Sequence, residues 1–255
     1  TKFAALCLGG LLCLTARADE TCMSPYMAKI VGQEDFVYVW TLGEKGLGDG
    51  SDKLVTVDAN PSSANYGKVI AKVSVGGRGE AHHMGYTDDR KFLWAGALDS
   101  NKIFIFDVAT NPAKPKLVRT IKNFVAKAGL VGPHTFYATP GRMLVGALSN
   151  PKDHGGKTGI ATYTNSGQYV TTTMMPTTGG GDGFGYDLAI NPNKNAMLTT
   201  SFTGWNNYMM DLGKLIKDGE AMKQFGNTSV MWDYKSMKPS KIFNTPGAPL
   251  EARWS

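Results

Sequence analysis

The sequence lacks most of the short motifs that indicate a particular chemistry. It contains no GxSxG nucleophile elbow, no CxxC pair and no glycine-rich phosphate loop that joins a strand to a helix. The glycine-rich stretches GEKGLGDG and TTGGGDGFG predict turns or channel-lining loops instead. These absences argue against a serine hydrolase, a dithiol oxidoreductase and a nucleotide-binding enzyme.

Charge of one sign is not concentrated anywhere along the chain. The formal net charge is +6, yet the lysines are scattered and no stripe of aromatic and basic residues accompanies them. We therefore expect a mixed, solvated surface and no nucleic-acid partner. Assembly into a homo-oligomer stays open at this point, because no residue pattern bears on it.

Cysteines and long apolar runs are also scarce. Residues 2–18 (KFAALCLGGLLCLTARA) combine a basic start, a short apolar stretch and a small-x-small end. This pattern predicts a Sec-type signal peptide over residues 1–18, export to the periplasm and no membrane insertion, since the stretch is too short to span a bilayer. Of the 3 cysteines, Cys7 and Cys13 lie inside the signal. Cys22 alone would then remain, so no internal disulfide is expected.

After a leader segment at residues 19–35, the chain consists mostly of short strand-like runs separated by Asn, Gly, Pro and Asp turns. The runs rich in Val, Ile, Phe, Tyr and Thr predict strands near residues 36–42, 52–59, 67–75, 91–98, 101–109, 142–149, 158–164, 196–202 and 228–234. Helical segments are expected near residues 123–129 and 209–226, as insertions between strands. The sequence therefore predicts an all-β fold.

The strand-like runs repeat with a period near fifty residues. GALDSN begins at Gly96 and GALSN begins at Gly146, and a His-x-x-Tyr unit precedes each, at His83 and His134. About four strands in a unit of this length are typical of a β-propeller blade. An all-β sandwich with accidental similarity is the alternative. The propeller is favoured because histidine, turn, strand and Gly-Ala-Leu recur together.

About four such blades fit into residues 36–255, which we interpret as part of one domain. Propellers typically close with about four to eight blades, and an open arc would leave unpaired strand edges. We therefore expect this chain to be a fragment, the N-terminal part of a single β-propeller domain that is truncated at its C-terminus.

Two of the 4 histidines, His82 and His83, are adjacent. Neighbouring side chains of a regular strand face opposite ways, but nearby glycines would allow a kink that turns both rings to one point. Equivalent repeat positions converge on a propeller's central channel, so His83 and His134 are expected to meet there. A histidine taken alone is more often a structural residue than a metal ligand. The repeated placement of these histidines nevertheless predicts a metal site. His82 would be either a ligand or a group that faces the substrate. His154, in a glycine-rich loop, is expected to be exposed.

Six segments of the chain together resemble a known family. In order they are KLVTVDANPSSANYGKVIAKV, EAHHMGY, NKIFIFDVATNPAKPKLVRTI, GPHTFYATPGRMLVGALSN, GYDLAINPNKNAMLTTSF and APLEARW. They are similar to the selenium-binding protein family, whose exported bacterial members are methanethiol oxidases, and the resemblance runs from about Phe36 to Ser255. It implies a seven-bladed propeller of which this chain is roughly the N-terminal half.

The resemblance also implies a copper site built from histidines, at His82, His83 and His134 in this sequence, with a further histidine beyond Ser255. The implied reaction oxidises methanethiol with O2 and water to formaldehyde, hydrogen sulfide and hydrogen peroxide. A soft thiolate sulfur suits copper, and copper offers the one-electron path to O2 that zinc lacks.

One position departs from the pattern of the animal members, which carry a cysteine implicated in selenium binding. That segment reads VDANPSSANYGKVI here, with Gly67 at the position of the cysteine. A covalent selenium or thiol role at this position is excluded for this chain, which favours the oxidase. A non-catalytic propeller that binds metal, thiol or selenium stays as the alternative.

Overall fold

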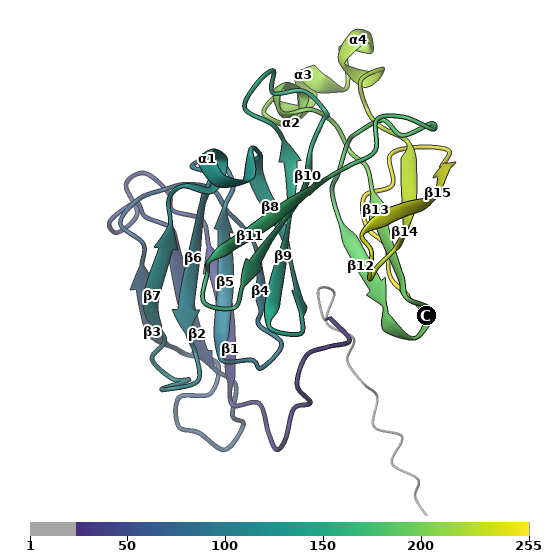
Figure 1. Ribbon diagram of the computed structural model, residues 1–255. Coiled ribbons are helices and arrows are strands. Elements are labelled where there is room, and N and C mark those ends of the chain that lie inside the picture. Colours follow the sequence, from purple (N-terminus) through teal and green to yellow (C-terminus); the bar gives the residue numbers. More distant parts are fainter. Residues whose placement is uncertain (1–23, 255) are drawn as a thin grey trace, which may run out of the picture.

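The computed structural model describes residues 24–254, and these form four antiparallel sheets that follow one another along the chain (Figure 1). The expected signal peptide and Cys22 lie outside the described residues, as does the first part of the leader segment. Each sheet is a meander in which consecutive strands pair, so each is one blade of a β-propeller. The predicted all-β propeller fold is confirmed.

Blade 1 has three strands: β1 (Phe36–Thr41), β2 (Lys53–Asp58) and β3 (Val69–Ser74). Blade 2 has four: β4 (Ala81–Tyr86), β5 (Phe92–Ala97), β6 (Lys102–Asp107) and β7 (Lys116–Ile121). Blade 3 also has four: β8 (Val131–Thr139), β9 (Arg142–Ser149), β10 (Gly159–Thr164) and β11 (Tyr169–Met174). Blade 4 consists of β12 (Leu188–Asn191), β13 (Ala196–Thr200), β14 (Thr228–Asp233) and β15 (Lys238–Asn244).

All nine predicted strands are present, and the strands that the pattern left out are the first or last of their blades. The first strand of blade 2 reads AHHMGY, in which histidine and glycine interrupt the apolar alternation. The last strand of blade 2 reads KLVRTI and has an exposed, mixed surface. Neither composition has the run of β-branched and aromatic residues on which strand prediction depends.

The helices are short. α1 (Phe124–Ala128) lies where a helix was predicted. The single helical segment expected near residues 209–226 is instead two short helices, α3 (Leu212–Leu215) and α4 (Gly219–Met222), preceded by α2 (Trp205–Tyr208). The prediction of one helix was wrong because Asp218 caps a new helix: its carboxylate accepts hydrogen bonds from the backbone N–H groups of Glu220 and Ala221. Of the helices within residues 24–254, none has the length and apolar character needed to cross a membrane.

The apolar core lies between consecutive blades rather than within any one of them. One cluster joins Trp40 and Leu54 of blade 1 to Phe106 of blade 2. Two further clusters fill the space between blades 2 and 3 and between blades 3 and 4. Trp40 also donates a hydrogen bond from its indole Nε1 to the carbonyl oxygen of Gly96, at 2.8 Å. Each blade is therefore held in place by the flat faces of its neighbours.

Blades 2 and 3 are in close contact where Phe136 of β8 lies against two glycines. A Cβ atom on Gly85 would lie 2.4 Å from the carbonyl oxygen of Phe136, and one on Gly96 would lie 2.8 Å from its ring. Any side chain at either glycine would push the two blades apart. Both glycines therefore set the spacing of β4 and β8, the two strands that carry the predicted site residues.

We expect Gly85→Ala to destabilise the fold, because the added methyl group overlaps backbone atoms that cannot move without shifting β8. The free energy of unfolding should fall by about 1–3 kcal/mol, measured by urea denaturation. Gly77→Ala is the matched control, since a Cβ atom there has nothing within 4 Å and the backbone needs no positive φ. Equal stability of the two variants would contradict this account of the blade spacing.

Candidate metal centre

The adjacent histidines lie on β4 at a β-bulge. Ala81 is opposite Ala97 of β5, whereas Met84 is opposite Ala95, so β4 has one more residue than its partner between these two pairs. The extra residue breaks the alternation that would send His82 and His83 to opposite faces. Their rings lie 4.7 Å apart, centroid to centroid. The expected kink is present, and it is a β-bulge rather than a turn made by glycine.

A second bulge lies in β8, at the matching place in blade 3. Pro133 is opposite Ala147 of β9, and Phe136 is opposite Val145, so His134 and Thr135 occupy the irregular positions. Ala97 and Ala147 stand at the same point of the two Gly-Ala-Leu segments, GALDSN and GALSN.

The sheet register therefore makes His82 the structural counterpart of His134, and His83 the structural counterpart of Thr135. The His-x-x-Tyr alignment, which paired His83 with His134, is wrong by one residue. The reason is the place of the tyrosine after each bulge: Tyr86 lies two residues after Met84, whereas Tyr137 lies one residue after Phe136. Counting back three residues from each tyrosine therefore misses the matching histidine by one position.

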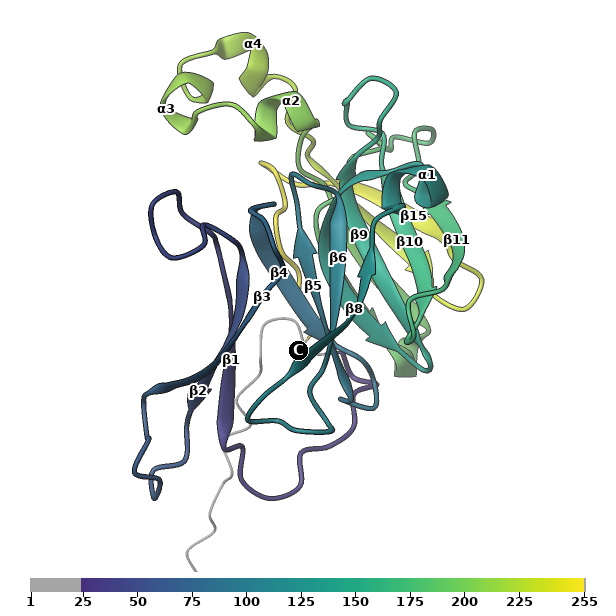
Figure 2. The same cartoon turned by 90° about the vertical axis from the view of Figure 1, so that its left-hand side faces the viewer.

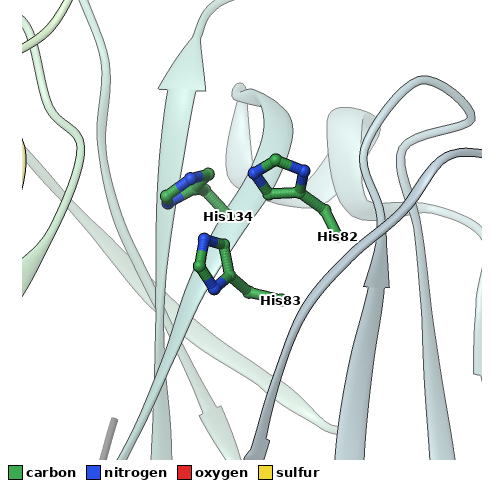
Figure 3. A group of neighbouring side chains, drawn as sticks. All are labelled: His82, His83 and His134. Atoms are coloured by element: carbon green, nitrogen blue, oxygen red, sulfur yellow. The ribbon is translucent and has the colours of Figure 1, made fainter. Parts of the chain in front are cut away.

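The two bulges bring the three predicted site residues together, as Figure 3 shows. The ring of His83 lies 4.3 Å from that of His134, and the ring of His82 lies 4.9 Å from it. One ring nitrogen from each of the three histidines lies within 4.8 Å of the others. Imidazole nitrogens at this separation can share one metal ion. Their role as ligands stays a prediction.

Hydrogen bonds fix the orientation of the His134 ring. Its Nδ1 lies 3.1 Å from the carbonyl oxygen of Tyr186 and 3.1 Å from Oγ1 of Thr135. A carbonyl oxygen can only accept, so Nδ1 carries the proton and Nε2 carries the lone pair. That Nε2 is buried and has no hydrogen-bond partner among residues 24–254. A buried lone pair without a partner, on a ring beside two other imidazoles, fits a metal ligand.

Burial keeps all three rings in the neutral form that metals bind. Desolvation lowers the pKa of His134 well below its ordinary value, and the nearby His83 and His82 lower it further. Desolvation also lowers the pKa of His82 to about 4, with a contribution from His83. The pKa of His83 is lowered for the same reason. At neutral pH the cluster therefore offers lone pairs without having to lose protons first.

Acidic and basic groups stand on two sides of the histidines. On one side, Oε1 of Glu80 lies 3.9 Å from Nδ1 of His82, and burial together with the Asp99 carboxyl raises the pKa of Glu80 to about 7. On the other side, the buried carboxylate of Asp187 receives a hydrogen bond from Nη1 of Arg253 at 2.5 Å. Glu80 and His82 are two positions apart in the sequence, whereas the Asp187–Arg253 pair joins residues 66 positions apart.

Sequence reasoning missed several neighbours of the site. Thr135 follows His134 directly, yet no motif marks a threonine as the group that orients a histidine. Glu80 and Tyr208 are joined by a hydrogen bond across 128 residues of sequence separation, for which the sequence carries no signal. His154 lies in an exposed loop away from the cluster, as expected.

Comparisons with known proteins place this arrangement in a family. The sequence profile of the 56kDa selenium binding protein (SBP56) family matches residues 16–254, which include all three histidines of the cluster. The chain belongs to the SBP56 family. The resemblance read from the sequence segments is confirmed.

Among curated SBP56 relatives, the chain is similar to a methanethiol oxidase of Hyphomicrobium sp, with 63% identity over 252 residues that cover 98% of this chain and 58% of the relative. It is 55% identical to a methanethiol oxidase of Ruegeria pomeroyi over 268 residues, which cover 99% of this chain and 62% of the relative. The chain thus spans less than two thirds of the length of these relatives. It also resembles the X-ray structure of a hypothetical selenium-binding protein from Sulfolobus tokodaii, with a TM-score of 0.74 and 25% identity over 88% of this chain and 52% of that one.

We expect the metal-free protein to lose stability in acid through these histidines. Because the folded-state pKa of each lies below the ordinary value of about 6.5, the unfolded chain binds more protons than the folded chain. Stability is therefore full above about pH 6.5 and falls as the pH drops towards about 4, the pKa of His82. Thermal unfolding of chelator-treated protein, measured from about pH 7.5 to about pH 4.5, reports this loss of stability.

His134→Gln is the comparison variant, because glutamine does not titrate. The wild type should lose stability relative to this variant as the pH falls. A difference between the two proteins that stays constant over the whole range would show that the His134 ring is not held neutral by burial.

Proposed function

We propose that the protein is a copper-dependent methanethiol oxidase, which converts methanethiol, O2 and water to formaldehyde, hydrogen sulfide and hydrogen peroxide. The observation that carries the proposal is the cluster of three imidazoles with one buried, unpartnered nitrogen. The methanethiol oxidases at 63% and 55% identity support the choice of substrate.

The donor set fits copper. His82, His83 and His134 would hold the ion through neutral imidazole nitrogens, which suit copper and zinc far better than magnesium or calcium. Bound copper would supply a soft acceptor for the thiol sulfur and a one-electron path to O2. Three protein ligands leave room for a substrate or for a further ligand, such as the histidine that the family resemblance implies.

The residues around the cluster have distinct tasks in this proposal. Thr135 and the carbonyl of Tyr186 hold the His134 ring through Nδ1, which leaves Nε2 for the metal. His82 keeps a quarter of its side-chain surface accessible, which leaves an approach for a small thiol. The buried β8 strand closes the opposite side, where His134 itself is 1% exposed.

We further propose that the protein acts in the periplasm. The basic start, short apolar stretch and small-x-small end of residues 2–18 support this location, since they match a Sec signal. Export in the unfolded state would mean that copper enters the site after translocation. Methanethiol and O2 are small enough to reach such a compartment.

Replacing one cluster histidine is the direct test of the metal site. In the full-length protein, His134→Asn should reduce bound copper from about one ion per chain to less than about a tenth, because loss of a ligand and of its buried lone pair removes the site. Copper is measured by elemental analysis after dialysis, and activity by methanethiol-dependent oxygen uptake with detection of released sulfide.

His154→Asn is the control, since it removes an exposed histidine from a loop and asparagine tolerates the positive φ of 50° found there. It should keep both copper and activity. Full copper and full thiol oxidation in His134→Asn would show that the ligand assignment is wrong. Bound copper without oxygen uptake in the wild type would instead favour a non-catalytic metal- or thiol-binding propeller.

Thr135→Val tests the group that orients the ligand. Valine keeps the shape of threonine but removes the Oγ1 atom that contacts His134 Nδ1 and donates to Tyr186 O. Copper affinity should fall by about 10- to 100-fold, measured by competition with a chelator. Thr56→Val is the matched control, because Thr56 is equally buried but its hydroxyl has no partner within residues 24–254. An unchanged affinity in Thr135→Val would remove Thr135 from this role.

A further inference from the structure

The segment between β13 and β14 carries the three helices α2, α3 and α4 at one end of the blades, near β4 and β8 (Figures 1 and 2). α2 is anchored to blade 3. The indole of Trp205 packs on the backbone of Gly132, where a Cβ atom would lie 2.5 Å from Cζ3. The backbone N–H of Trp205 donates to the His154 carbonyl oxygen at 2.9 Å. The glycine at position 132 thus makes room for the ring.

A buried amide holds this segment in one conformation. Asn207 is 4% exposed, and its side-chain nitrogen donates to Oγ1 of Thr203 at 3.0 Å and to the carbonyl oxygen of Ala221 at 2.8 Å. These bonds tie α2 to the start of the segment and to α4. Because a buried amide is costly to leave unpaired, the segment has a fixed shape where it meets the histidines.

Three aromatic rings of blade 4 and α2 connect His134 to His82. The ring of Tyr186 lies 4.2 Å from that of His134, and the ring of Phe202 lies 4.9 Å from that of Tyr186. The ring of Tyr208 follows at 6.3 Å from Phe202 and lies 6.2 Å from the ring of His82. We call Tyr186, Phe202 and Tyr208 the aromatic wall. Each of its rings is half-buried, so apolar surface remains accessible beside the histidines.

A hydrogen bond joins the aromatic wall to the residue that precedes the first strand of blade 2. The hydroxyl of Tyr208 donates to Oε1 of Glu80 at 3.2 Å. Glu80 has a φ of 61°, a conformation that is costly for a residue with a side chain, and it precedes the bulge that carries His82 and His83. This geometry directs its carboxyl group to Tyr208 rather than along the regular strand.

We propose that the aromatic wall binds the alkyl group of the thiol and limits its length. The proposal rests on the proposed function, in which the thiol sulfur is bound at the histidines. A sulfur held there places its alkyl group beside the wall, where the ring faces can remove a methyl group from water. Because Asn207 and the Tyr208–Glu80 bond fix the wall in place, a longer chain meets rings that cannot move aside. Phe202 and Tyr208 are then specificity-determining residues, and Glu80 is a positioning residue.

Truncation of the wall in the copper-loaded, full-length protein tests this role. Phe202→Ala and Tyr208→Ala should raise the ratio of kcat/KM for butanethiol to that for methanethiol by about 10-fold or more, because space for added methylene groups is gained. Phe202→Leu should give a smaller rise and covers the case in which the alanine variant fails to fold. Tyr208→Phe keeps the ring but loses the bond to Glu80, so it should raise KM for methanethiol with little change in kcat.

Phe243→Ala is the matched control, since Phe243 lies on β15, the last strand of the same blade, and is 36% exposed. It should leave the ratio unchanged. An unchanged ratio in Phe202→Ala, Phe202→Leu and Tyr208→Ala, with full copper content, would overturn the proposal.

A binding measurement separates this proposal from the proposed function. Titration calorimetry of zinc-loaded protein with methanethiol and butanethiol reports alkyl-chain selectivity without any oxidation. If the wild type holds copper but takes up no oxygen, the oxidase assignment fails, and the calorimetric ratio still decides the role of the wall. If the ratio of the affinity for butanethiol to that for methanethiol rises in Phe202→Ala, the proposed role of the aromatic wall is supported. An unchanged affinity ratio contradicts that role.

Discussion

The close contact of β4 with β8 is the constraint on which the candidate site depends. Phe136 lies against the backbone of Gly85 and close to Gly96, with no space for a Cβ atom at either glycine. This contact brings the bulge of blade 2 next to the bulge of blade 3. Histidines that are about fifty positions apart along the chain thereby come within 5 Å of one another, ring to ring. A change in blade spacing would therefore move these histidines apart.

Burial of three imidazoles lowers the stability of the metal-free protein. Desolvation lowers the pKa of each ring, and the lone pair on Nε2 of His134 has no partner within the described residues. Sites of this kind combine neutral ligands with a rigid frame, so that a metal binds without displacing protons or moving strands. The same features that weaken the empty protein in acid would therefore favour metal binding at neutral pH.

Much of the fold could be predicted from local pattern. The nine strands with β-branched and aromatic runs are present, and the fifty-residue period correctly indicated propeller blades. The strands that carry the histidines were harder to predict because they contain bulges, glycine and polar residues. The pairing of His83 with His134 failed because the tyrosine on which the alignment depends lies one residue further from the bulge in β4 than in β8. The segment near residues 209–226 failed because Asp218 begins a separate helix.

The sequence by itself determined the blade repeat, the SBP56 resemblance and the three histidines, because these are properties of residue type and spacing. Only the tertiary structure decided which nitrogen of His134 carries the lone pair, since that depends on Tyr186 and Thr135 contacting the ring together. It also decided that Tyr208 meets Glu80 across 128 positions. Such contacts arise from blade packing and from the path of an insertion, and no local pattern in the chain encodes them.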